Sequence, residues 1–75
     1  MLRHEGTILE CMPSETDKGF KEGKIKPDRD DSPILDFTRC PHNFEEGDKV
    51  TFEIIAVRSG GEVKGIAEKV EPVRF

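Results

Sequence analysis

The C-terminal part of the chain carries the pattern that most restricts the fold. Residues 50–54 alternate apolar and polar side chains, which is the period of a half-buried β-strand. Ser59-Gly60-Gly61 follows as a hairpin turn, and residues 62–70 return as a second strand. No segment has a convincing helical period, so the chain has to be built from strands.

Three shorter segments complete the set of strands. Residues 6–12 are rich in β-branched and apolar side chains and are followed by Pro13. Residues 19–26 form a weaker strand pattern that contains Gly19 and Gly23, and residues 34–37 form a short strand. The 75 residues leave room for one small domain, 1–75. Five short strands in such a chain predict an all-β, closed or nearly closed antiparallel barrel, because closure removes exposed sheet edges.

Composition excludes several classes of protein. Charged residues make up 37% of the chain and hydrophobic residues 33%, and no apolar run approaches the roughly 20 residues that span a bilayer. There is no Ser-His-Asp ordering and no phosphate-binding glycine loop, so we do not expect an enzyme. Among the cysteines and histidines, Cys40 and His42 are the only close pair, and Cys11 and His4 are far away in sequence, so we expect neither a metal site nor a cofactor.

The N-terminus has no apolar signal segment, which predicts a cytoplasmic protein with free thiols. The net charge is −4, so a basic footprint over the whole chain is absent. Locally, however, residues 18–26 hold four lysines and one acid, Glu22. This basic ribbon is compatible with phosphate binding and equally with an ordinary solvated hairpin.

Several stretches resemble the cold-shock domain family, and they occur in the order that the family has. They are Gly6-Thr7-Ile8, Lys18-Gly19-Phe20, Ile34-Leu35-Asp36-Phe37, residues 44–54 and Gly65-Ile66-Ala67-Glu68-Lys69-Val70. The resemblance covers roughly residues 5–73. It implies a five-stranded antiparallel oligonucleotide-binding (OB) barrel that binds single-stranded RNA or DNA by stacking bases on aromatic side chains.

The chain departs from the family at several aromatic positions. Lys18-Gly19-Phe20 matches the start of the first ribonucleoprotein motif, but two residues are then inserted and Lys24 stands where a second phenylalanine belongs. In the second motif only Phe37 is kept, and Asp36 replaces the histidine. The family's tryptophan on the first strand is missing. A carboxylate on the binding face repels phosphate, so binding should be weak.

The resemblance gives a specific set of binding residues. Phe20 and Phe37 are expected to stack bases, although either could instead fill the barrel. Phosphate contacts are expected from Lys18, Lys24, Lys26 and Arg39. Phe44 and Phe52 are expected in the core, with Val50 and Ile54 on the same strand face as Phe52.

These residues predict a function in binding. The leading hypothesis is weak, poorly sequence-selective binding of single-stranded nucleic acid, RNA rather than DNA, in the manner of an RNA chaperone. The protein is expected to act as a monomer, away from membranes. The alternative is an OB-fold protein-interaction module that has lost its stacking face and docks through a sheet edge or through the polar face with Glu10 and Asp36.

Overall fold

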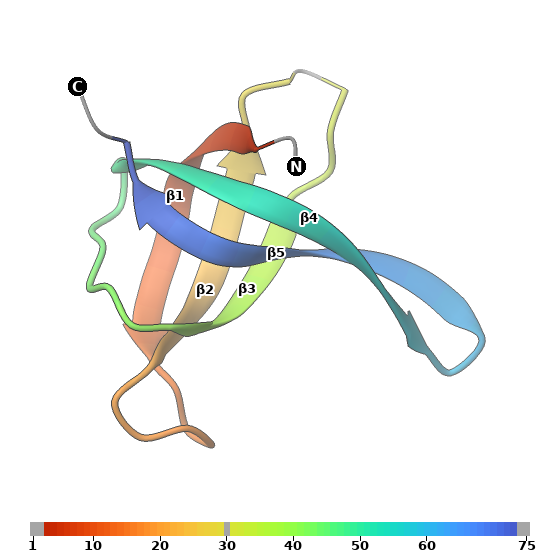
Figure 1. The fold of residues 1–75 in the computed structure, drawn as a ribbon, viewed down its shortest axis with the longest axis horizontal. Helices are drawn as coiled ribbons and strands as arrows, with labels where there is room; N and C mark the ends of the chain where they lie inside the picture. Colours follow the sequence, from red (N-terminus) through yellow and green to blue (C-terminus); the bar gives the residue numbers. More distant parts are fainter. Residues whose placement is uncertain (1–2, 30, 74–75) are drawn as a thin grey trace.

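The structure is a computed structural model that describes residues 3–29 and 31–73. These residues form the strands β1 (His4–Pro13), β2 (Lys21–Pro27), β3 (Leu35–Cys40), β4 (Lys49–Ser59) and β5 (Glu62–Pro72) (Figure 1). Each of the five expected strands is present, and β1, β3, β4 and β5 run further than the sequence pattern predicted. The second strand begins only at Lys21, so the expectation that Phe20 lies on it is wrong. Within the described ranges, no helix is long and apolar enough to cross a membrane.

The strands close into a barrel in the order β1-β2-β3-β5-β4, with β4 pairing back onto β1. This confirms the closed five-stranded barrel, and it is consistent with an OB-type fold. The expectation of a purely antiparallel sheet is wrong, because β3 and β5 pair in parallel at Asp36–Ile66 and Phe37–Ala67. The reason lies in the connection after β3, which crosses the end of the barrel to bring β4 beside β1. The next hairpin then returns β5 in the direction of β3.

The barrel interior is filled by side chains from all five strands. Buried hydrophobic residues are Ile8, Ile25, Leu35, Phe37, Cys40, Phe44, Val50, Phe52, Ala67 and Val70. Phe44 and Phe52 therefore lie in the core, as expected. Ile54 does not, because it is 43% exposed. The pairing of β1 with β4 ends at Phe52, so Ile54 lies where β4 leaves the barrel wall.

Two irregularities bend the strands around this small core. The register of β1 against β2 shifts between Ile8 and Glu10, and that of β2 against β3 shifts between Lys21 and Gly23, where the two inserted residues were identified. At Gly23 a Cβ atom would lie 1.9 Å from the Glu10 carbonyl oxygen. The backbones of β1 and β2 approach each other so closely that only glycine fits there.

The β4–β5 hairpin extends beyond the barrel and projects to one side of the molecule (Figure 1). Its turn is at Gly60 and Gly61, with φ angles of 57° and 87°. Positive φ at both central residues is the geometry of a type I′ turn, whose twist matches that of the flanking strands. The turn predicted from the sequence is therefore confirmed.

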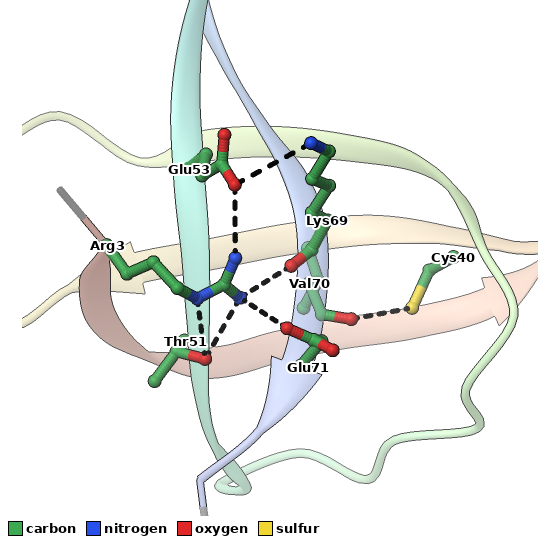
Figure 2. A network of polar contacts seen from close by, with 7 residues as sticks. All are labelled: Arg3, Cys40, Thr51, Glu53, Lys69, Val70 and Glu71. Atoms are coloured by element: carbon green, nitrogen blue, oxygen red, sulfur yellow. Dashed lines mark hydrogen bonds and ion pairs between the residues drawn. The ribbon is translucent and has the colours of Figure 1, made fainter. Parts of the chain in front are cut away.

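An arginine next to β1 ties the start of the chain to β4 and β5 (Figure 2). The Arg3 guanidinium donates to Thr51 Oγ1 at 3.0 Å and to the Lys69 carbonyl oxygen at 2.7 Å. It also forms ion pairs with Glu53 at 3.4 Å and Glu71 at 3.1 Å. This planar fork fixes both strands of the hairpin where they join the barrel.

Candidate nucleic-acid interface

Phe20 lies in the loop between β1 and β2 and is 39% exposed. The loop is ordered by its own hydrogen bonds. Ser14 N donates to the Phe20 carbonyl oxygen at 2.9 Å, and Phe20 N donates to that of Asp17 at 3.2 Å. Ser14 Oγ also accepts from the backbone N–H of Asp17 at 3.1 Å. Phe20 is therefore presented on a folded loop, with part of its ring open to solvent.

Phe37, the second expected stacking residue, is in a different environment. Its side chain is 1% exposed and points into the barrel core, opposite Ala67 on β5. The expectation that Phe37 is displayed for base stacking does not hold in this structure. Alternation along β3 explains this placement, because Leu35 and Phe37 lie on the inner face and Asp36 lies between them on the outer face.

The expected phosphate-binding lysines are exposed, but they have different neighbours. Lys24 Nζ lies 3.3 Å from Asp36 Oδ1, and Lys64 Nζ lies 3.5 Å from the other oxygen of the same carboxylate. Lys18 and Lys26 are exposed, and neither forms an ion pair with any residue in the described ranges. Of the three expected lysines, Lys24 would have to leave Asp36 to contact a phosphate, whereas Lys18 and Lys26 would break no ion pair with the described residues.

Arg39 lies near the end of β3 with its side chain 78% exposed. Its Nε is 3.6 Å from Asp17 Oδ2, so the guanidinium reaches across to the loop that carries Phe20. The Arg39 φ angle is 54°, which is unusual for a residue with a side chain. This contact places Arg39, predicted to contact phosphate, at the same end of the barrel as Phe20, predicted to stack a base.

A shallow depression of about 300 Å³ crosses the outer face of β1, β2 and β3. Its lining includes Lys24 and three acids, Glu10, Glu22 and Asp36. Strand pairing places Glu10 opposite Lys24, and Lys24 opposite Asp36. The lysine is therefore flanked by carboxylates, which weakens the attraction of this part of the face for phosphate.

In the described part of the chain, no group of three or more His, Cys, Asp or Glu side chains could hold a metal ion. Cys11 and Cys40 are both free. Burial raises the pKa of the Cys40 thiol above its ordinary value of 9.0, so the reactive thiolate is disfavoured there.

The structure also shows a surface that the sequence did not predict. A groove of about 400 Å³ lies between the start of β3 and the projecting hairpin, with Ile34, Ile54 and Val63 exposed in it. Their exposures are 56%, 43% and 66%. The apolar alternation of β4 predicted burial for Ile54. This prediction is wrong because the alternation does not show that the barrel wall ends before Ile54.

Comparison with protein-family models, with curated proteins and with solved structures gives no match to this chain. The class of protein is defined here by its fold and its surface. It is a small closed β-barrel of OB type, with one exposed aromatic ring on the β1–β2 loop and an apolar groove beside the β4–β5 hairpin.

Proposed function

We propose that the protein is a binding module, not an enzyme, and that it binds single-stranded nucleic acid weakly. In OB folds the β2–β3 face and the β1–β2 loop are common sites of oligonucleotide binding. The observation that carries the proposal is the exposed Phe20 ring on that loop, with the exposed Lys18 two residues before it and the exposed Lys26 on β2.

The same observation limits the strength of binding. One stacked base contributes about 1–3 kcal/mol, and Phe37 adds nothing while it is in the core. The logarithm of the binding constant falls linearly with the logarithm of the salt concentration, and each phosphate contact on a single strand makes this slope steeper by about 0.7. We therefore infer poor sequence selectivity and strong salt dependence. RNA is the proposed ligand ahead of DNA, and the resemblance to cold-shock domains supports an RNA-chaperone-like role.

The test is a titration of the isotopically labelled protein with a short oligo-pyrimidine, followed by backbone amide shifts at two salt concentrations. We expect shifts in the β1–β2 loop and along β2 that fade at high salt. Phe20→Ala should weaken binding by about tenfold, since it removes one stack. The matched control is Val57→Ala, because Val57 is 37% exposed on the hairpin, close to the 39% of Phe20. Equal effects of the two substitutions would contradict the proposal.

A second candidate function is protein docking, and the apolar groove beside the hairpin favours it. Ile34, Ile54 and Val63 together expose apolar surface that a small soluble domain usually buries. Binding there should change little with salt, whereas phosphate binding should weaken steeply. The two candidate functions use different parts of the molecule, since the Phe20 loop and the hairpin lie apart (Figure 1).

A further inference from the structure

The hairpin has a free backbone edge directly beside the apolar groove. On one side, residues 62–65 of β5 pair with β4. On the other side, the pairing with β3 starts only at Asp36–Ile66, and no other described strand continues it. An unpaired edge with apolar side chains next to it is a template for another strand.

We propose that this edge binds the same edge of a second copy of the chain, forming an antiparallel, two-fold symmetric dimer. The inference rests on the second candidate function, protein docking at the hairpin groove, and it names the partner. In a two-fold interface each residue meets its counterpart by symmetry. With Val63 of both copies at the centre, the two most exposed apolar side chains of the groove lie opposite each other.

Charge complementarity supports this partner over an unrelated peptide. In the proposed register, Glu62 of one copy lies directly opposite Lys64 of the other copy, and the same contact occurs a second time by symmetry. Both side chains are exposed, and they lie on the sheet face opposite Val63, because successive side chains alternate. Opposite charges in directly facing positions stabilise an antiparallel pair, and like charges destabilise it. The edge is therefore complementary to itself.

The proposed dimer contact would also cover the apolar groove, which is exposed to water in a single chain. Val63, Ile54 and Ile34 line the groove on the Val63 side of the hairpin. A second strand along residues 62–65 would lie next to these side chains and shield them from water. The sequence predicted a monomer, but neither the free edge nor the exposure of Ile54 is visible in the sequence.

The test is sedimentation equilibrium of the whole chain over a range from micromolar to near-millimolar protein. We expect the mass to rise toward twice that of the monomer. Glu62→Lys places the new lysine opposite Lys64 of the other copy at both symmetric positions, which should weaken the dimer about tenfold or more. The triple variant Glu62→Lys/Lys64→Glu/Asp36→Asn restores opposite charges across the interface without placing the new carboxylate beside that of Asp36, which lies 3.5 Å from Lys64, and it should restore the dimer.

Glu68→Lys is the matched control, because Glu68 is an exposed residue of the same strand and the change in net charge is identical. It should leave the dimer unchanged. Val63→Lys, at a position 66% exposed, should abolish association while the monomer stays folded, as checked by circular dichroism. A monomeric mass at the highest concentration would overturn the proposal. So would a dimer that responds equally to Glu62→Lys and Glu68→Lys, or one that the triple variant does not restore.

A titration with a short peptide of alternating valine and threonine distinguishes failure of the dimer proposal from failure of protein docking as such. Amide shifts at residues 62–65 on adding this peptide to a monomeric chain would show that the edge binds another strand, and would overturn the second copy as its partner. A monomer without such shifts would overturn both. Neither result bears on oligonucleotide binding, which is read from the β1–β2 loop.

Discussion

Asp36 lies 3.3 Å from the ammonium group of Lys24 on the neighbouring strand, in the middle of the face where an OB barrel is expected to meet nucleic acid. The second oxygen of the same carboxylate lies 3.5 Å from Lys64. One acid thus neutralises part of the charge of two lysines that could otherwise contact phosphates.

Replacing this acid should strengthen oligonucleotide binding. Asp36→Asn removes one negative charge from the face and releases Lys24 and Lys64. A unit charge at 4 Å in water corresponds to about 1 kcal/mol, so affinity for an oligo-pyrimidine should rise about fivefold, with a steeper salt dependence. Fluorescence anisotropy at several salt concentrations measures both. The control is Asp31→Asn, which changes an exposed acid in the β2–β3 connection, and weaker binding by Asp36→Asn would refute the proposed phosphate path.

The two phenylalanines identified from the sequence should behave in opposite ways. Phe37→Ala should lose about 3–5 kcal/mol, which is most of the stability of a domain this small, because Phe37 is buried. Phe37→Leu is the milder test and should lower the thermal midpoint while oligonucleotide affinity stays within about twofold. Phe20→Ala should lower affinity without changing the midpoint. A folded Phe37→Leu protein that binds as poorly as Phe20→Ala would show that Phe37 reaches the ligand.

Gly23→Ala should be among the most destabilising single-methyl changes in the chain. The added Cβ would lie 1.9 Å from the Glu10 carbonyl oxygen, so β1 and β2 would have to separate. We expect a loss of about 3 kcal/mol or more in urea unfolding. Gly65→Ala is the matched control, since its Cβ would meet Leu35 and Ile54 at ordinary distances of 3.5 and 3.6 Å. Similar losses for both alanines would contradict the close approach at Gly23.

Arg3 should contribute to stability through geometry as well as charge. Arg3→Ala removes the contacts to β4 and β5 and should cost about 1–2 kcal/mol, a value discounted because its side chain is 31% exposed. Arg3→Lys keeps the charge but cannot reproduce the planar fork, so it should recover little of the loss. Urea unfolding measures the change in the free energy of unfolding, provided that the m-value stays constant. The control is Arg29→Ala, at an exposed arginine in the β2–β3 connection, which should change stability by less than about 0.5 kcal/mol.

The buried Cys40 thiol gives the fold a pH dependence at the alkaline end. Its pKa in the folded state is raised by burial above the ordinary value of 9.0. The resulting stabilisation is complete below about pH 9 and is lost as the pH rises through the folded pKa, because the unfolded thiol releases its proton first. Urea midpoints should fall more steeply above pH 9 in the unmodified chain than in Cys40→Ala. Cys11→Ala should keep the steep fall, and a parallel fall in all three proteins would contradict this assignment.

The sequence predicted the fold better than the binding surface. Alternation at residues 50–54 and the glycine turn at 60–61 fixed the hairpin, because both signals act between near neighbours in the chain. The orientation of β5 against β3 was not predictable in this way, since it depends on how the chain crosses the barrel end. Phe37 and Ile54 show the same limit, because their exposure depends on which strand covers them and where that strand ends.

The pairing of β3 with β5 is the shortest in the barrel, at Asp36–Ile66 and Phe37–Ala67, and it joins strands that the whole of β4 separates in the chain. Chain entropy opposes this contact until the preceding hairpin has formed, so it should be the last to form during folding. In native-state fluctuations it should also be the first to separate. The molecule would then divide into a three-stranded sheet of β1–β3 and a β4–β5 hairpin, still joined through β1 and β4. Opening along this line, which passes through Asp36, is therefore the local fluctuation that amide hydrogen exchange should detect first.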